Sequence, residues 1–104
     1  MHWHDAEKYR NEHVFPHVSV EAATYLLERG VVGLGIDTLS ADLPAEGHPV
    51  HRAVLGSGRY LVENVAQSEK LPPVGSHVMC LPAKMGGGTE APVRLVGLVP
   101  KIPE

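Results

Sequence analysis

Cysteine, basic runs and long apolar runs are all scarce in this chain. Only one of its 104 residues is a cysteine, Cys80. No internal disulfide can therefore form, and its apolar neighbours favour a buried structural thiol in a reducing compartment. No apolar run approaches the length of a membrane span, and the N-terminus lacks a basic stretch followed by an apolar one. The sequence predicts an unsecreted, cytoplasmic protein without a membrane partner.

Positive charge is sparse as well. Nine Lys and Arg residues stand against twelve Asp and Glu residues, which gives a formal net charge of -3. Nucleic-acid-binding proteins usually carry a basic face, so no nucleic-acid partner is expected. Dinucleotide and phosphate binding are not indicated either, because Gly30, Gly33 and Gly35 lack the spacing of the dinucleotide fingerprint and the run 86–88 lacks the lysine of a phosphate loop.

The chain is short for an independent fold. A chain of 104 residues buries only roughly 60 to 65% of its unfolded surface, so its core is modest. Its hydrophobic content is near the globular average, which argues against intrinsic disorder. We expect a single α/β domain over residues 1–104 that is supported by a partner, with an N-terminal arm over residues 1–17.

Two helices and four strands are expected. The candidate N-cap Ser19, the acidic Glu21 in the first turn and the stop at Gly30 predict a long helix over residues 19–29. A short helix is expected over residues 51–55. Apolar or alternating runs predict four strands, the last two paired across a glycine-rich turn: 31–36, 59–65, 76–84 and 92–99.

Histidine is abundant, but its spacing does not identify a site. The chain has seven histidines: His2, His4, His13, His17, His48, His51 and His77. No pair forms a zinc signature such as His-Glu-x-x-His. Asp37 ends the run 31–36, a common place for a site residue in layered α/β folds. The interpretation we favour is that it caps the following loop by an Asx-type turn.

His51 and Glu63 are carried toward each other by the predicted helix, glycine turn and strand. In the strand, Glu63 shares a face with Leu61. A carboxylate directed at a core must be paired, hydrogen-bonded or bound to a metal, since burying it bare is too costly. On spacing alone, a surface histidine and a solvated glutamate remain the default interpretation.

Several sequence blocks occur in the order of a known family. Gly-Ile-Asp-Thr-x-Ser-x-Asp begins at Gly35, and His-Arg-x-x-Leu-Gly-x-Gly-x-x-x-x-Glu-Asn begins at His51. Leu-Pro-x-Lys and Gly-Gly-x-x-x-Pro-Val-Arg follow, from Leu81 and Gly87. The chain resembles the cyclase family of metal-dependent hydrolases, whose best-known member is kynurenine formamidase of tryptophan catabolism. The resemblance implies the latter part of a swivelling β/β/α-type fold.

The same resemblance implies that His51 and Glu63 bind a divalent metal, zinc or manganese. His48 is a runner-up ligand, disfavoured because it does not stand at the family's position relative to Glu63. It also implies a small-molecule amide substrate, a formamide or a cyclic amide, whose C–N bond is hydrolysed by metal-activated water. The family's His-x-Gly-Thr-His-x-Asp block, which holds the other ligands and the acid/base histidine, has no counterpart in these residues. We therefore expect the C-terminal half of an enzyme and assign no catalytic residue.

Three hypotheses stay open at this point. In the first, the chain is a fragment or subunit of such a hydrolase, completed by an N-terminal half. In the second, it is a non-catalytic remnant that acts as an oligomeric binding or structural module. In the third, it is a small metal-binding protein that completes its site with histidines of a second copy. Uncovered sheet edges and apolar faces predict a homo-oligomer.

Overall fold

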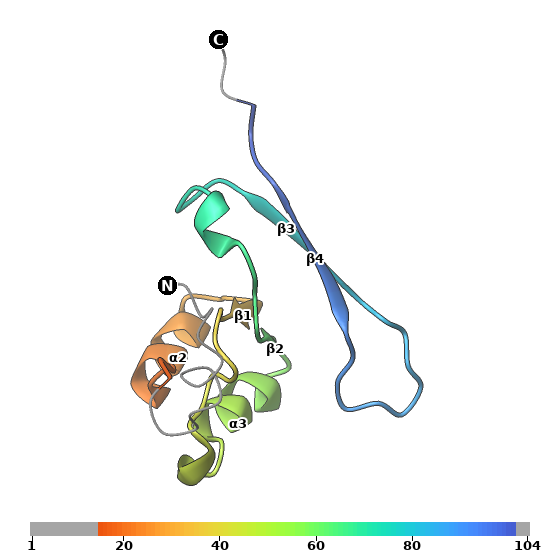
Figure 1. The fold of residues 1–104 in the computed structure, drawn as a ribbon. Helices are drawn as coiled ribbons and strands as arrows, with labels where there is room; N and C mark the ends of the chain where they lie inside the picture. Colours follow the sequence, from red (N-terminus) through yellow and green to blue (C-terminus); the bar gives the residue numbers. More distant parts are fainter. Residues whose placement is uncertain (1–14, 102–104) are drawn as a thin grey trace. The chain divides into compact units, whose positions relative to one another are not determined.

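A computed structural model of the chain describes residues 15–101 (Figure 1). The chain divides into two compact units, Met1–Ala66 and Gln67–Glu104. Helices α2 and α3 and strands β1 and β2 belong to the first unit, and strands β3 and β4 belong to the second. The predicted α/β class, with one long helix, one short helix and four strands, is confirmed for the described residues. The single domain predicted over residues 1–104 stays a prediction.

Helix α2, Val20–Glu28, has the termini that its sequence predicts. The Ser19 hydroxyl accepts a hydrogen bond of 3.1 Å from the Ala22 N–H and so caps the helix. After the helix, Gly30 adopts a left-handed conformation with φ of 78°, which glycine accepts without a side-chain penalty. Ala23 on the inner face is buried. Local signals were therefore sufficient to place this helix.

Strands β1, Gly33–Gly35, and β2, Tyr60–Val62, pair in parallel with Leu34 opposite Leu61. They lie inside the predicted strands 31–36 and 59–65 but are shorter. Backbone hydrogen bonds nevertheless continue past both ends, including one of 2.9 Å from the Asn64 N–H to the Thr38 carbonyl. The chain after β1 is thus held beside the chain after β2.

Helix α3, Pro49–Gly56, begins two residues before the predicted segment 51–55. Proline suits the first helical position because its fixed φ is helical and it has no N–H left without a partner. The core of the first unit combines α2, α3 and the loop after β1. Its buried residues are Ala23, Ala41, Val50 and Val54. Leu34 and Leu61 of the two strands pack against them.

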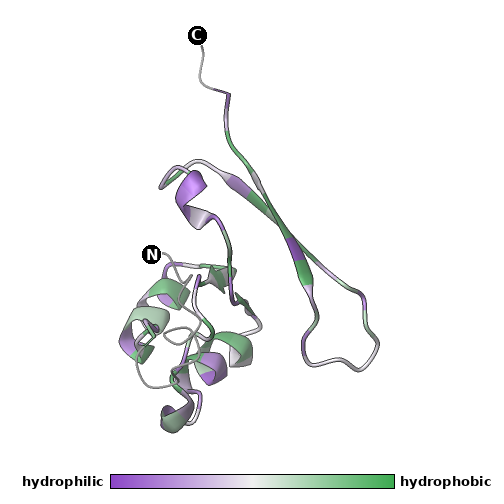
Figure 2. Cartoon of the chain, viewed as in Figure 1, coloured by the Kyte–Doolittle hydropathy of each residue, from purple (hydrophilic) through white to green (hydrophobic). Residues whose placement is uncertain are grey.

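The second unit is built on an antiparallel ribbon of β3, His77–Pro82, and β4, Val93–Leu98. This hairpin confirms the predicted pairing of residues 76–84 with 92–99. Apolar residues recur along both strands (Figure 2). Many of them are exposed, among them Val78, Met79 and Leu81. Cys80 is only partly buried, so the prediction of a buried thiol was wrong, because the ribbon does not enclose its side chains.

The predicted N-terminal arm, 1–17, lies outside the described residues apart from residues 15–17. Phe15 is buried, and the Pro16 carbonyl accepts a hydrogen bond of 2.8 Å from the Thr38 hydroxyl. The end of the arm is thus joined to the loop after β1. Within residues 15–101, no helix combines the length and the apolar character needed to span a membrane.

Candidate metal site

The loop over residues 38–42, which follows β1, carries part of the site and is held in place by several hydrogen bonds. The Thr38 side chain, 1% exposed, donates to the carbonyls of Pro16 and Ser40. The Ala41 carbonyl accepts a hydrogen bond of 3.0 Å from the Val18 N–H. At the end of the loop, the Ser40 hydroxyl accepts from the Asp42 N–H at 3.2 Å. These bonds fix the direction in which Asp42 points.

Asp42 caps helix α3 from outside the helix. Its carboxylate is 1% exposed, and its two oxygens accept 2.8 Å hydrogen bonds from the N–H groups of Val50 and His51. The residue at the N-cap position, His48, has a left-handed backbone with φ of 59° and makes no side-chain cap. Since Pro49 has no N–H, Asp42 satisfies the first two donors of the helix.

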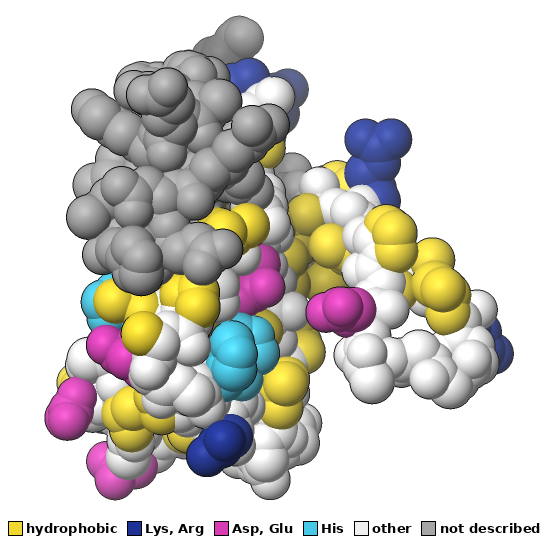
Figure 3. All heavy atoms as spheres, turned by 60° about the horizontal axis from the view of Figure 1, so that its bottom comes forward, with side chains coloured by type: hydrophobic (Ala, Val, Ile, Leu, Met, Phe, Trp, Pro, Cys, Tyr) yellow, Lys and Arg dark blue, Asp and Glu magenta, His cyan; other side chains and the backbone are white. Residues whose placement is uncertain are grey.

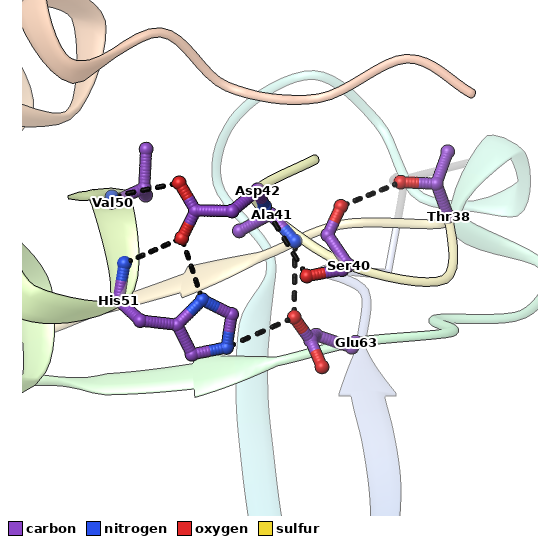
Figure 4. A network of polar contacts seen from close by, with 7 residues as sticks. All are labelled: Thr38, Ser40, Ala41, Asp42, Val50, His51 and Glu63. Carbon is purple, nitrogen blue, oxygen red and sulfur yellow. Dashed lines mark hydrogen bonds and ion pairs between the residues drawn. The ribbon is translucent and has the colours of Figure 1, made fainter. Parts of the chain in front are cut away.

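The His51 ring lies between two carboxylates (Figure 4). Its Nδ1 is 2.7 Å from Oδ2 of Asp42, and its Nε2 is 3.4 Å from Oε1 of Glu63. The structure therefore brings together His51 and Glu63, the two ligands that the sequence predicts. Their binding of a metal stays a prediction.

Glu63 is the residue directly after strand β2, and a backbone N–H of the loop over residues 38–42 holds its carboxylate. Its Oε1 accepts a hydrogen bond of 3.0 Å from the Ala41 N–H. Leu61, two residues earlier, packs against the core, as expected for two side chains on one face of a strand. The expectation that this carboxylate has a partner is confirmed for its oxygen Oε1. The other oxygen, Oε2, accepts no hydrogen bond from the residues that the structure describes.

The charge state of Asp42 determines what the His51 ring offers to Glu63. Burial alone would raise the pKa of Asp42, but hydrogen bonds from His51 and Val50 and the attraction of His51 together hold this pKa below its ordinary value. Asp42 is therefore an ionised carboxylate at neutral pH and acts as an acceptor only. The ring must donate its Nδ1 proton to Asp42, and a neutral ring then carries its lone pair on Nε2, which faces Glu63.

The distance between Nε2 and Oε1 fits two ligands of one metal ion. Two atoms that each lie about 2.0–2.1 Å from a tetrahedral zinc are about 3.4 Å apart. The distance here is 3.4 Å. A lone pair opposite a carboxylate oxygen is repulsive unless a cation lies between them, and that cation is either a proton or a metal. His51 and Glu63 are 28% and 29% exposed, and histidine side chains reach the molecular surface (Figure 3), so an ion can enter from solvent.

His48 also comes close to this site. Asp42, His48 and His51 each offer a ligand atom, and these atoms lie within 4.8 Å of one another. The rings of His48 and His51 have their centroids 5.4 Å apart. Both Asp42 oxygens already accept hydrogen bonds, and Oδ2 faces the ring of His51. His48 is exposed and close to His51, and its role as the runner-up ligand stays a prediction.

The other candidates are not among the described contacts of His51 and Glu63. His2, His4 and His13 lie outside the described residues, and His77 lies on β3 in the second unit. The Asx-type turn expected at Asp37 is not present within residues 15–101, where the Asp37 carboxylate has no hydrogen bond to another described residue. Ser40 forms the corresponding turn instead, because its hydroxyl accepts from the Asp42 N–H.

Asp42 is the site residue that the sequence did not single out. It belongs to the block that begins at Gly35, but nothing in its spacing assigns it a role. One signal in the sequence could have pointed to it: helix α3 begins with proline, and the residue before it is histidine, which caps helices poorly. Such a helix needs an acceptor from elsewhere in the chain.

Comparisons with known proteins place the chain beside hydrolases. The family model described as a putative cyclase matches residues 1–43. Isatin hydrolase from Roseibium aggregatum is 30% identical over 91 residues, which make up 83% of this chain and 35% of that protein.

Two solved structures share the fold. The crystal structure of an isatin hydrolase bound to the product analogue thioisatinate has a TM-score of 0.76 at 30% identity, over 83% of this chain and 35% of that one. A potential metal-dependent hydrolase with cyclase activity has a TM-score of 0.69 at 31% identity, over 78% of this chain and 40% of that one. The chain thus spans well under half the length of the proteins that it matches.

Proposed function

Since the chain is related to the cyclase family of hydrolases and spans part of the length of its relatives, we propose that it supplies part of the metal centre of a metal-dependent hydrolase. The observation that carries the proposal is the 3.4 Å spacing of His51 Nε2 and Glu63 Oε1. That spacing suits a shared divalent ion, zinc or manganese. The likeness to a potential metal-dependent hydrolase supports it.

In this proposal the residues of the chain hold and orient the ion. His51 and Glu63 bind it, Asp42 sets the ring of His51, and the Ala41 N–H fixes one oxygen of Glu63. A divalent metal at such a site lowers the pKa of a bound water and polarises a carbonyl group. Catalytic zinc sites take three protein ligands and keep one position open. The remaining ligands come from His48, from a complementary N-terminal half or from a second copy of the chain.

The proposed reaction is hydrolysis of the C–N bond of a cyclic amide or a formamide. Water adds to the carbonyl carbon, the C–N bond breaks, and the nitrogen takes up a proton. Isatin contains a cyclic amide, so the likeness to isatin hydrolase favours the cyclic class over the formamide. An arylformamidase activity, as in tryptophan catabolism, is the narrower form of the same proposal.

A non-catalytic metal-binding or structural module is the second candidate. The observation that favours it is the small number of ligands, because His51 and Glu63 are only two and His48 is exposed. Such a module would bind the metal as an oligomer without turnover.

The test is metal content together with solution mass, measured on the full chain purified without a chelator. We expect stoichiometric zinc or manganese, lost in His51→Ala and in Glu63→Gln. Glu28→Gln is the matched control, because this exposed carboxylate at the end of α2 has no described contact with His51 or Glu63, and it should leave the metal content unchanged. Hydrolysis of isatin or an aryl formamide by the metal-loaded protein supports the enzyme, and metal binding without turnover supports the module. Metal that persists in both variants overturns the proposed site. Metal-free protein excludes His48 and a second copy as the source of the remaining ligands and leaves the complementary N-terminal half.

A further inference from the structure

We propose that Asp42 is a positioning residue that makes Nε2, rather than Nδ1, the metal-binding nitrogen of His51. The part of this inference that concerns the metal rests on the proposed function. The part that concerns the ring rests on hydrogen bonds within this chain alone and can be tested without any metal.

One oxygen of Asp42 holds both the backbone and the ring of His51. Oδ2 accepts from the His51 N–H at 2.8 Å and is 2.7 Å from Nδ1 of the same residue. These two bonds define the side-chain rotamer, because the ring cannot turn its Nδ1 toward Glu63 without leaving Asp42. The ring therefore presents Nε2 to Glu63, as Figure 4 shows.

Asp42 itself has little freedom to follow a moving ring. Its side chain is 1% exposed, its other oxygen accepts from the Val50 N–H at 2.8 Å, and its own N–H donates to the Ser40 hydroxyl. Because the first N–H groups of α3 hold the Asp42 carboxylate, the position of the group that contacts the ring is fixed. The bond that caps α3 and the bond that orients His51 thus come from one side chain.

The chemical benefit is known from metal sites in general. A histidine ligand usually donates its other ring N–H to a carboxylate or carbonyl, which fixes the tautomer and makes the ligating nitrogen more basic, and loss of that partner weakens metal binding by about 10–100-fold. Asp42 is a carboxylate of this kind, because it contacts Nδ1 of His51 while Nε2 faces Glu63. Its burial distinguishes it from an exposed ligand, and Oδ2, the oxygen that faces the ring, is already occupied by two contacts with His51.

The first test is the tautomer of His51 in metal-free protein at alkaline pH, where the ring is neutral, read from the ring nitrogen shifts by NMR. His51→Gln identifies the signals among the seven histidines. In the wild-type chain we expect the proton on Nδ1. In Asp42→Ala no side-chain atom of residue 42 accepts from Nδ1, so we expect the proton to move to Nε2, which carries it in a free neutral imidazole side chain.

The second test is metal affinity, measured by calorimetric titration of the same proteins with zinc. Asp42→Ala should bind zinc about 10–100-fold more weakly than the wild type. Ser19→Ala is the matched control. It removes the cap of α2, where the Ser19 hydroxyl accepts from the Ala22 N–H, and so weakens a helix start without touching His51. Its zinc affinity should be unchanged.

The outcomes separate the two proposals. A wild-type ring protonated on Nε2, an Asp42→Ala ring that keeps its proton on Nδ1, or an inverted tautomer with undiminished zinc affinity overturns the role of Asp42. If the wild type binds no zinc but the tautomer inverts in Asp42→Ala, the chain alone does not complete a metal site and the control of the ring by Asp42 stands. If Asp42→Ala does not fold, the tautomer of the wild-type ring alone tests the proposal.

Discussion

Ala41 and Asp42 are neighbours in the chain, and each holds one of the two predicted metal ligands. The Ala41 N–H donates to Oε1 of Glu63 at 3.0 Å, and Oδ2 of Asp42 lies 2.7 Å from Nδ1 of His51. One short loop therefore sets the spacing of a ligand on helix α3 and a ligand after strand β2. A change that displaces the loop should disturb both ligands without touching either of them.

Thr38→Val tests how firmly the loop is held. The buried Thr38 hydroxyl donates to the carbonyls of Pro16 and Ser40, and valine leaves these acceptors without that donor. We expect the free energy of unfolding to fall by about 1–3 kcal/mol, measured by urea denaturation. Thr24→Val is the control, because the exposed Thr24 hydroxyl bonds only within α2 and its loss should cost less than about 0.5 kcal/mol. Equal losses in the two variants would refute the special role of Thr38.

The lowered pKa of Asp42 predicts how the stability of the metal-free chain depends on pH. The pKa is lower in the folded than in the unfolded protein, so ionised Asp42 stabilises the fold above the unfolded value of about 3.9. This stability is lost as the pH falls through the folded pKa. The difference in unfolding free energy between the wild type and Asp42→Asn should be constant near neutrality and shrink below about pH 4. A difference that does not change between neutral and acidic pH would contradict this assignment.

Gly33→Ala should weaken the pairing of β1 with β2. Gly33 lies opposite Tyr60 in the parallel register, and a Cβ atom at Gly33 would collide with the Tyr60 ring. The ring must move off the strand, and because Tyr60 is 46% exposed it can turn toward solvent, so the loss should stay below about 1 kcal/mol. Thermal unfolding measures the effect. Gly56→Ala is the matched control, because nothing lies within 4 Å of its added Cβ, and alanine at this helical position should be neutral or slightly stabilising. A Gly33→Ala chain as stable as the control would show that the ring does not need this space.

Self-association stays a prediction, and the ribbon of β3 and β4 is the place to test it. Leu81 on β3 is 54% exposed, and Leu55 on α3 is 51% exposed. A two-stranded ribbon is only marginally stable alone, so we expect a solution mass above that of one chain. Leu81→Lys should lower this mass, whereas Leu55→Lys should not. A mass of one chain at all concentrations would contradict the expected oligomer.

Local chemistry explains which parts of the fold could be predicted. Helix α2 was placed correctly because Ser19 and Gly30, its start and stop signals, lie next to it in the sequence. The start of α3 was placed two residues late because its cap, Asp42, comes from a loop that precedes it by several residues. Long-range caps leave no periodic pattern in a sequence.

The pairing of His51 with Glu63 followed from the family resemblance, and the structure places the two side chains as that resemblance requires. Spacing alone favoured solvated side chains. The part that could not be foreseen is the direction of the ring, because it depends on the fold of the loop that ends in Asp42. Sequence therefore predicted that His51 and Glu63 approach each other, and the structure adds Asp42, which contacts the ring of His51. Their binding of a metal stays a prediction.

The most direct test of the metal site is the position of the ion in a crystal of the zinc-loaded full chain, located by anomalous scattering. The account predicts one zinc about 2.0–2.2 Å from both Nε2 of His51 and a carboxylate oxygen of Glu63, with Nδ1 of His51 still bonded to Asp42. Zinc bound to Nδ1 of His51, or bound only at histidines other than His51, would contradict it.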